Sequence, residues 1–201
     1  MPQYARFTAG CIPRLDVVGT SMSGLGRASE IPGCTRWPAI HSADERGSFS
    51  KVLSAPIRSS MGYDFHVREI FWNRSRRGVI RGMHLQLPPF EGAKVIWITA
   101  GQIRDVVVDL RSNSPTYGKH VVFEMDNTAG LLFIPVGCAH GFEVLSESAI
   151  VNYAQECNFA PESDSGVRWN SFGCEWTAQS PIVSQRDMLL PMFNEFDSPF
   201  Q

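Results

Sequence analysis

The sequence predicts an all-β protein folded as a sandwich or a barrel. Short runs rich in β-branched and aromatic residues recur about every 10–12 residues between positions 35 and 176. Gly, Pro, Asn or Ser separates these runs, and no long stretch carries a convincing helical period. Such spacing is typical of sandwiches and barrels, whereas strands alternating with helices would indicate a parallel sheet.

The clearest strands follow one another in the middle of the chain. Residues 95–98 form a β-rich run that ends at the turn residues 100–102, and residues 103–110 form the next run. Pro135 and Gly137 end a later strand. The remaining elements are strands at residues 121–125, 131–134, 142–145 and 149–153, and a short helix near the C-terminus at residues 184–196.

Composition and charge narrow the class of protein. The chain has 201 residues, a net charge of −2, an apolar fraction of 43% and a charged fraction of 19%, all ordinary for a globular domain. No basic stripe indicates a nucleic-acid partner, and no apolar stretch approaches the ~20 residues of a membrane span. Residues 1–30 predict a poorly ordered extension, which leaves residues 31–201 as a single domain.

The five cysteines indicate a reducing compartment. Their number is odd and no Cys-x-x-Cys pair occurs, so neither a disulfide framework nor a zinc site is expected. The N-terminus also lacks the charged region and apolar core of a signal peptide. We therefore predict a cytoplasmic protein.

Two of the five histidines, His84 and His140, lie in unusual surroundings. Each stands beside glycine, which permits close backbone approach, and beside an apolar strand. A histidine at the mouth of a barrel and near an arginine is suited to proton transfer on an anionic ligand. The alternative, a histidine satisfied inside the core, stays open from these residues alone.

Other kinds of catalytic site do not match the sequence. There is no His-x-His pair, and the first acidic residue after His84 is Glu91, so a site of two histidines and one carboxylate is not expected. A Gly-x-Ser-x-Gly elbow and a glycine-rich phosphate loop are both missing from the sequence. We predict no metal in the site.

Five ordered segments together resemble the dTDP-4-dehydrorhamnose 3,5-epimerase family. Residues 78–86, GVIRGMHLQ, are similar to the family's VLRGLHYQ signature. The other four segments are DERG at 44–47, DVVVDLR with SPTYG at 105–118, IPVGCAHGF at 134–142 and GVRWN at 166–170. The resemblance covers about residues 31–191 and implies a cupin-like jelly-roll barrel, a homodimer, a nucleotide-sugar substrate and no metal or organic cofactor.

The resemblance also implies roles for individual residues. His84 takes the place of the family's general base, and Tyr153 that of the proton donor on the opposite face of the sugar. Asp187, in a segment similar to the family's LSAKD, takes the place of the carboxylate that pairs with the base. Contacts to the substrate are expected from Arg46, Phe49, Glu69, Phe71, Arg81, Lys94 and His140.

The chemistry of epimerisation fits these residue types. Inverting a carbon beside a ketone needs a base, an acid on the other face and positive charge near the carbonyl oxygen. We therefore predict an enzyme that epimerises C3, C5 or both of a nucleotide-linked 4-keto-6-deoxy sugar through an enolate. A sugar-nucleotide 3,4-ketoisomerase and a non-catalytic sugar-nucleotide-binding protein remain the alternatives, although binding alone does not need Tyr153 together with Asp187.

The chain departs from the family pattern upstream of residues 78–86. The family carries a Gln-x-Asn-x-Ser segment that contacts the nucleotide, and here Glu69 and Phe71 replace the Gln and the Asn. An ionised carboxylate only accepts hydrogen bonds and a phenyl ring makes none, although the ring can stack on a base. We therefore predict that the nucleotide pocket is not a standard thymidine site.

Overall fold

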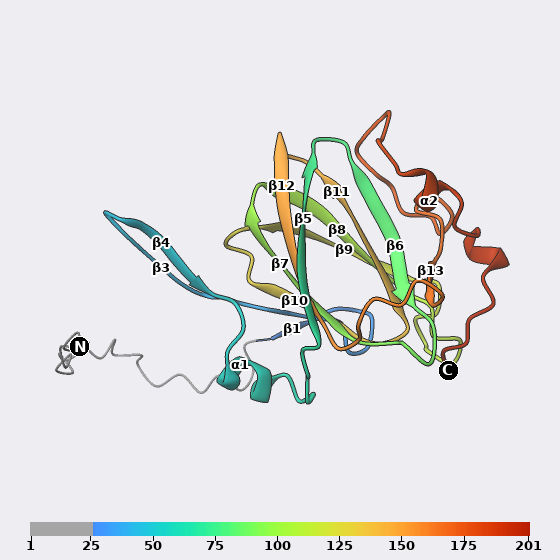
Figure 1. The fold of residues 1–201 in the computed structure, drawn as a ribbon, viewed down its shortest axis with the longest axis horizontal. Helices are drawn as coiled ribbons and strands as arrows, with labels where there is room; N and C mark the ends of the chain where they lie inside the picture. The colour runs from blue at the N-terminus through green and yellow to red at the C-terminus, as the bar shows by residue number, and fades with distance from the viewer. Residues whose placement is uncertain (1–25) are drawn as a thin grey trace, which may run out of the picture.

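The computed structural model describes residues 26–201, and two β-sheets packed face to face form its body (Figure 1). Residues 1–25, most of the predicted extension, lie outside the described residues. Within the remainder of that segment, strand β1 (Arg27–Ala28) pairs with strand β2 (Thr35–Trp37) at one edge of the first sheet. Every ladder between named strands is antiparallel, as expected for a barrel built from hairpins and crossovers.

The sheets divide the strands between two walls. The order of the six-stranded sheet is β1, β2, β10 (Leu131–Ile134), β7 (Lys94–Ala100), β12 (Ser148–Gln155) and β5 (Glu69–Arg76). The order of the five-stranded sheet is β13 (Asp164–Gly166), β6 (Ile80–Gln86), β11 (Cys138–Val144), β8 (Gln102–Asp109) and β9 (His120–Asp126). The predicted all-β jelly roll is confirmed.

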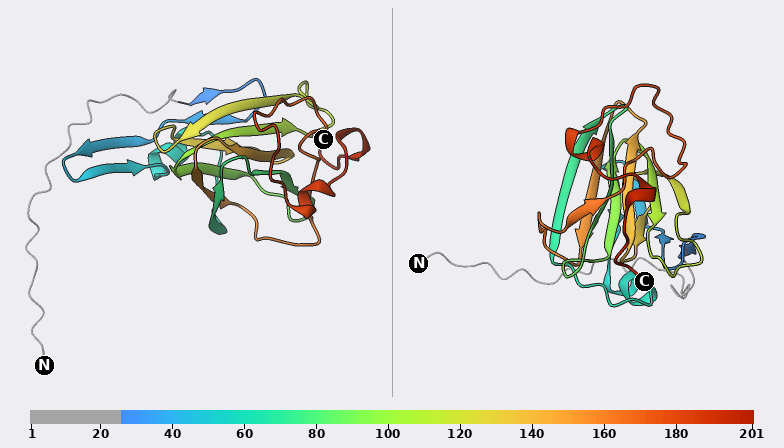
Figure 2. Two further views of the ribbon diagram at one scale, coloured as in Figure 1. Left: turned by 90° about the horizontal axis from the view of Figure 1, so that it is seen from above. Right: turned by 90° about the vertical axis from the view of Figure 1, so that its right-hand side faces the viewer.

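A separate hairpin and three short helices complete the fold of residues 26–201. The hairpin of β3 (Ile40–Asp44) and β4 (Gly47–Lys51) extends away from the barrel, as Figures 1 and 2 show. The helices are α1 (Ala55–Ser60), α2 (Gln185–Met188) and the 3₁₀ helix η1 (Phe193–Glu195). The helix predicted over residues 184–196 is thus two short helices, because Pro191 lacks a backbone N–H and disfavours helical geometry before it.

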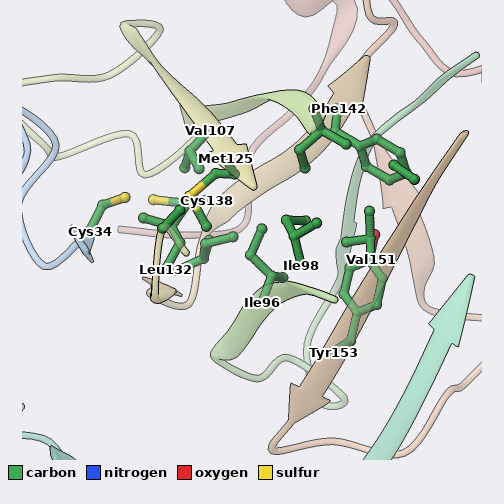
Figure 3. Close-up of a cluster of buried hydrophobic side chains, with 14 of the residues drawn as sticks. Cys34, Ile96, Ile98, Val107, Met125, Leu132, Cys138, Phe142, Val151 and Tyr153 are labelled. Carbon is green, nitrogen blue, oxygen red and sulfur yellow. The ribbon is translucent and has the colours of Figure 1, made fainter. Parts of the chain in front are cut away.

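Strand β8 explains how the core is arranged. Val107 packs into the cluster between the two sheets, whereas Val106 and Val108 pack into a second cluster under the C-terminal segment with Phe172 and Phe200. Because both faces of β8 are covered at this point, residues 106–108 are three consecutive valines rather than an alternation of apolar and polar residues. Figure 3 shows the cluster between the sheets, with Tyr153 among its members.

Two further observations concern the described residues as a whole. Within residues 26–201, no helix has the length and apolar character needed to cross a membrane. The four cysteines in this range, Cys34, Cys138, Cys157 and Cys174, are free thiols, and Cys11 lies outside it.

Candidate active site

Strands β6 and β11 place the two singled-out histidines opposite each other. His84 and His140 are direct partners in the antiparallel ladder, next to an irregularity in its register. Gly82 has a φ of +133°, and a Cβ atom there would lie 2.5 Å from the Cα atom of Gly141. The glycines of both motifs are therefore needed for the close approach of these strands.

His84 is paired with the carboxylate predicted for it. Its Nε2 atom lies 2.9 Å from Oδ1 of Asp187, and the backbone N–H of Gly82 donates to Oδ2 of Asp187 at 3.0 Å. Burial raises the pKa of Asp187, but the hydrogen bond and charge of His84 outweigh it, so that pKa lies below its usual value. An ionised Asp187 requires the proton of a neutral His84 on Nε2, which leaves the lone pair on Nδ1.

His140 forms a second pair of the same kind. Its Nε2 atom lies 2.7 Å from Oδ2 of Asp105, and Asp105 is fully buried. Burial raises the pKa of Asp105, and the charge and hydrogen bond of His140 oppose this shift. The other oxygen of Asp105 is buried without a hydrogen-bond partner, so the carboxylate depends on His140 for its satisfaction.

Tyr153 lies on the opposite wall, in strand β12. Its ring stacks on Phe71 with 4.6 Å between centroids and 8° between planes, and it meets the ring of His140 edge-on at 5.9 Å. The side-chain amide of Asn73 donates to the Tyr153 hydroxyl at 3.3 Å. Burial raises the pKa of Tyr153 above its usual range, so the phenol is protonated at neutral pH. Phe71 thus packs on Tyr153, whereas the sequence alone suggests that it can stack on a base.

Three cationic side chains, Lys94, Arg81 and Arg186, border the same pocket. Lys94 donates from Nζ to the backbone carbonyl of His84 at 3.2 Å, and burial lowers the pKa of Lys94. Arg81 donates from Nε to the hydroxyl of Ser75 at 2.9 Å and is otherwise exposed. The complete lining is Glu69, Phe71, Asn73, Arg81, His84, Leu85, Gln86, Lys94, His140, Phe142, Tyr153, Gln155, Phe159, Asp164 and Arg186.

The pocket therefore contains seven of the ten predicted site residues, and an eighth, Asp187, lies directly behind His84. The other two, Arg46 and Phe49, lie on the β3–β4 hairpin away from this pocket. The Arg46 side chain is 84% exposed and forms an ion pair with Asp44, and Phe49 is 59% exposed. Within one chain, the projection of the hairpin keeps these two residues apart from the rest.

The sequence motifs do not single out several of the pocket residues, although the spacing along the strands could have identified three of them. Asn73, Gln86 and Gln155 each lie two positions beyond a predicted residue on the same strand. Side chains two apart on a strand share a face, so each follows its neighbour into the pocket. The ion pair of Asp164 with Arg186 joins β13 to α2, and only the tertiary structure brings these residues together.

Residues 26–201 contain no group of three or more His, Cys, Asp or Glu side chains placed to hold a metal ion. Each pocket histidine instead pairs with a single carboxylate. Such pairs fix the tautomer of the ring and stabilise its protonated form, which suits proton transfer.

These features define a class of protein, a jelly-roll barrel whose pocket between the sheets brings together two histidine–carboxylate pairs and a buried tyrosine. The chain belongs to the dTDP-4-dehydrorhamnose 3,5-epimerase family, because the sequence profile of that family matches residues 28–195. The predicted family and the predicted assignment as an isomerase are thereby confirmed.

Similar proteins cover most of the chain. The dTDP-4-dehydrorhamnose 3,5-epimerase of Shigella flexneri is 32% identical over 164 residues, 80% of this chain and 91% of that protein. The protein of the same name from Methanothermobacter thermautotrophicus is 37% identical over 150 residues, 72% of this chain and 80% of that protein.

Solved structures agree with these relatives. The dTDP-6-deoxy-D-glucose-3,5-epimerase of Legionella pneumophila, in complex with dTDP-4-keto-L-rhamnose, has a TM-score of 0.82 at 28% identity. That similarity covers 88% of this chain and 97% of the Legionella chain. NovW, a 4-keto-6-deoxy sugar epimerase from Streptomyces spheroides, has a TM-score of 0.80 at 28% identity. That similarity covers 85% of this chain and 87% of the NovW chain.

Proposed function

We propose that this enzyme inverts C3, C5 or both of a nucleotide-linked 4-keto-6-deoxy sugar by proton transfer between His84 and Tyr153. The observation that carries the proposal is their placement, since the His84–Asp187 pair and the buried Tyr153 border one pocket from its two opposite walls. A sugar between the walls presents one face to the base and the other to the acid.

The proposed reaction has two proton transfers. Nδ1 of His84 removes the proton from the carbon beside the ketone, and the electron pair of the broken C–H bond moves onto the carbonyl oxygen as an enolate. Asp187 stabilises the resulting imidazolium, and the positive charge of Lys94 or Arg81 stabilises the enolate. Tyr153 then donates its proton to the same carbon from the other face, and solvent returns His84 and Tyr153 to their starting states.

Solvent deuterium incorporation tests this function. Nucleotide 4-keto-6-deoxy sugars are incubated with the enzyme in D₂O, and NMR follows deuterium at C3 and C5. We expect incorporation with the wild type and with the control His66→Ala, whose histidine is exposed and outside the pocket. We expect none with His84→Ala. Full exchange by His84→Ala would refute the assignment of the base.

The same spectra separate the rival functions. A 3,4-ketoisomerase would move the carbonyl from C4 to C3, which changes the carbon resonances of both positions. A non-catalytic binding protein would bind the sugar nucleotide and leave every C–H bond unlabelled. The similar proteins cited above are all named as epimerases, and this favours epimerisation over the two rival functions.

We further propose that the enzyme is a homodimer in which the hairpin of one subunit reaches the pocket of the other. Arg46, in the turn of the projecting hairpin, and Phe49, in the middle of β4, are exposed, although the family resemblance gives them substrate contacts. Strand β5 lies at the edge of its sheet and presents Ile70 and Trp72, 68% and 65% exposed, as an apolar surface for a partner.

Subunit complementation tests the shared site. Mixing Arg46→Ala with His84→Ala creates heterodimers in which one of the two sites has both residues intact. If subunits exchange freely, about a quarter of the wild-type activity returns, since about half of the dimers are mixed. Mixtures that stay as inactive as their parents, despite demonstrated exchange, would contradict the shared site.

A further inference from the structure

One end of the pocket lies away from the two histidines and has a different chemical character. Glu69 and Gln155 are partners across β5 and β12, one step along the strands from the Phe71–Tyr153 pair. Side chains two positions apart on a strand are about 7 Å apart, so this row lies just beyond the proposed acid. Phe159 completes this end, and its ring is 57% exposed although it borders the pocket.

The backbone on both sides of Phe159 is held by two side chains. Oε2 of Glu69 accepts hydrogen bonds from the backbone N–H of Phe159 at 2.9 Å and from the amide of Gln155 at 2.8 Å. Gln86 accepts from the N–H of Ala160 at 2.7 Å and donates to the carbonyl of Asn158 at 3.1 Å. The backbone that carries the exposed ring is therefore held in place, and the ring offers a flat surface of the kind on which a nucleobase stacks.

The second oxygen of Glu69, Oε1, has no hydrogen-bond partner among residues 26–201 and belongs to a side chain that borders the pocket. An ionised carboxylate accepts hydrogen bonds and cannot donate them. It repels the diphosphate of a nucleotide sugar, so the part of the ligand beside it must be neutral and must carry donors.

We propose that Glu69, beside the ring of Phe159, makes this end of the pocket select a nucleobase with an exocyclic amino group, namely cytosine, guanine or adenine. The amino group donates to Oε1 of Glu69 while the ring stacks on Phe159. Thymine and uracil instead present one ring N–H between two carbonyl oxygens, and those oxygens face the carboxylate unfavourably. The inference rests on the proposed function, because the ligand must be a nucleotide sugar with its sugar beside His84 and Tyr153.

The position of Lys94 supports an orientation of the ligand in which the base lies beside Glu69 and Phe159. Lys94 is the partner of Gln155 on the other side of β12, in the same row as Glu69. Two strand spacings, about 10 Å, separate Lys94 from Glu69. A diphosphate near Lys94 and the sugar beside His84 leave the base as the part of the ligand that reaches Glu69 and Phe159.

Calorimetric titration with CDP and UDP isolates the base, because the two share the same ribose and diphosphate. We expect the wild type to bind CDP at least about tenfold more tightly than UDP, the effect of one hydrogen bond to a charged acceptor. Titrations with GDP and ADP identify which amino-bearing base binds best, and dTDP is the comparison without an amino group. Equal affinity for CDP and UDP, with GDP and ADP no tighter, overturns the inference, as does a preference for dTDP.

Glu69→Gln provides the sharpest variant. The amide oxygen of Gln can accept both hydrogen bonds that Oε2 accepts, so the loop around Phe159 keeps its anchor, and the pocket-facing atom becomes an NH₂ donor. We expect the ratio of CDP to UDP affinity to fall below one. Glu124→Gln, an exposed glutamate on β9, makes the same change of charge outside the pocket and must leave the ratio unchanged. A ratio that is the same in Glu69→Gln and the wild type overturns the role of Glu69.

Phe159→Ala tests the stacking surface separately. Because the ring is largely exposed, its removal leaves the core intact, and we expect every nucleotide to bind about 5- to 100-fold more weakly. Unchanged affinities would overturn the role of Phe159. If no nucleotide binds the wild type, the inference fails together with the proposed function. If dTDP binds best and a dTDP-linked sugar exchanges deuterium, the inference fails alone.

Discussion

Replacing Asp187 with Asn tests the proposed mechanism most directly, because it removes one charge and keeps the shape of the side chain. Asp187 is only 3% exposed, so water cannot replace a lost hydrogen bond. Its two oxygens serve different partners, with Nε2 of His84 at 2.9 Å and the backbone N–H of Gly82 at 3.0 Å. An amide has one oxygen, which can satisfy only one of these donors.

The expected effect follows from that choice. If the amide nitrogen faced the Gly82 N–H, two donors would oppose each other in a buried place, at a cost of about 1–3 kcal/mol. The amide oxygen therefore stays on Gly82, and the amide nitrogen faces Nε2 of His84. His84 must then carry its proton on Nδ1, so the nitrogen proposed as the base has no lone pair. Reversal of a tautomer in a catalytic triad lowers turnover about 10⁴-fold, and we expect a loss of about 10²–10⁴-fold here.

The assay is the initial rate of solvent deuterium incorporation, measured with wild-type enzyme, Asp187→Asn and the surface control Asp64→Asn. Asp64 is exposed and pairs with the exposed His66 outside the pocket, so the rate of Asp64→Asn must match the wild type. Affinity for the nucleotide diphosphate must be the same in all three proteins, which shows that the pocket is intact. An Asp187→Asn rate within threefold of the wild type would show that His84 does not depend on Asp187 and would refute the reasoning.

Three other predictions concern the acid, the cofactor and acid stability. Tyr153→Phe removes only the hydroxyl and keeps the stack on Phe71, so we expect turnover to fall at least about 10²-fold with an unchanged melting temperature; retained turnover contradicts the role of Tyr153. Activity should survive EDTA, and a loss restored by one added metal would overturn cofactor-free chemistry. Burial raises the pKa of Asp109, but hydrogen bonds from Arg111, Ser114 and Thr116 lower it overall to about 2. The ionised Asp109 therefore contributes about 2 kcal/mol to the free energy of unfolding above pH 4, and this contribution is lost as the pH falls towards 2. Urea unfolding of the wild type and Asp109→Asn should show a difference in the free energy of unfolding that shrinks as the pH falls from 4 to 2. A difference that stays constant over this range would contradict the role of Asp109.

Much of the fold is predictable from local sequence. The predicted runs at residues 95–98, 103–110, 121–125 and 131–134 lie in strands β7, β8, β9 and β10, because β-branched residues and flanking turn signals act within a few positions. Residues 40–51 lack this pattern, since every residue of the β3–β4 hairpin is exposed and no core face imposes an alternation. Their strand structure is evident only in the folded protein.

The sequence by itself determined the family, through five ordered segments, and with it the expectation that His84, Asp187 and Tyr153 act together. The tertiary structure alone decided which groups meet in space. It paired Asp105 with His140, placed Phe71 on Tyr153, and kept Arg46 away from the pocket of its own chain. Neighbours along a strand follow from a period of two residues, whereas contacts between β5 and β12 or between β13 and α2 depend on how distant segments pack. No local pattern encodes that packing. The residues expected to act together could therefore be predicted from the sequence, whereas their contacts in space could not.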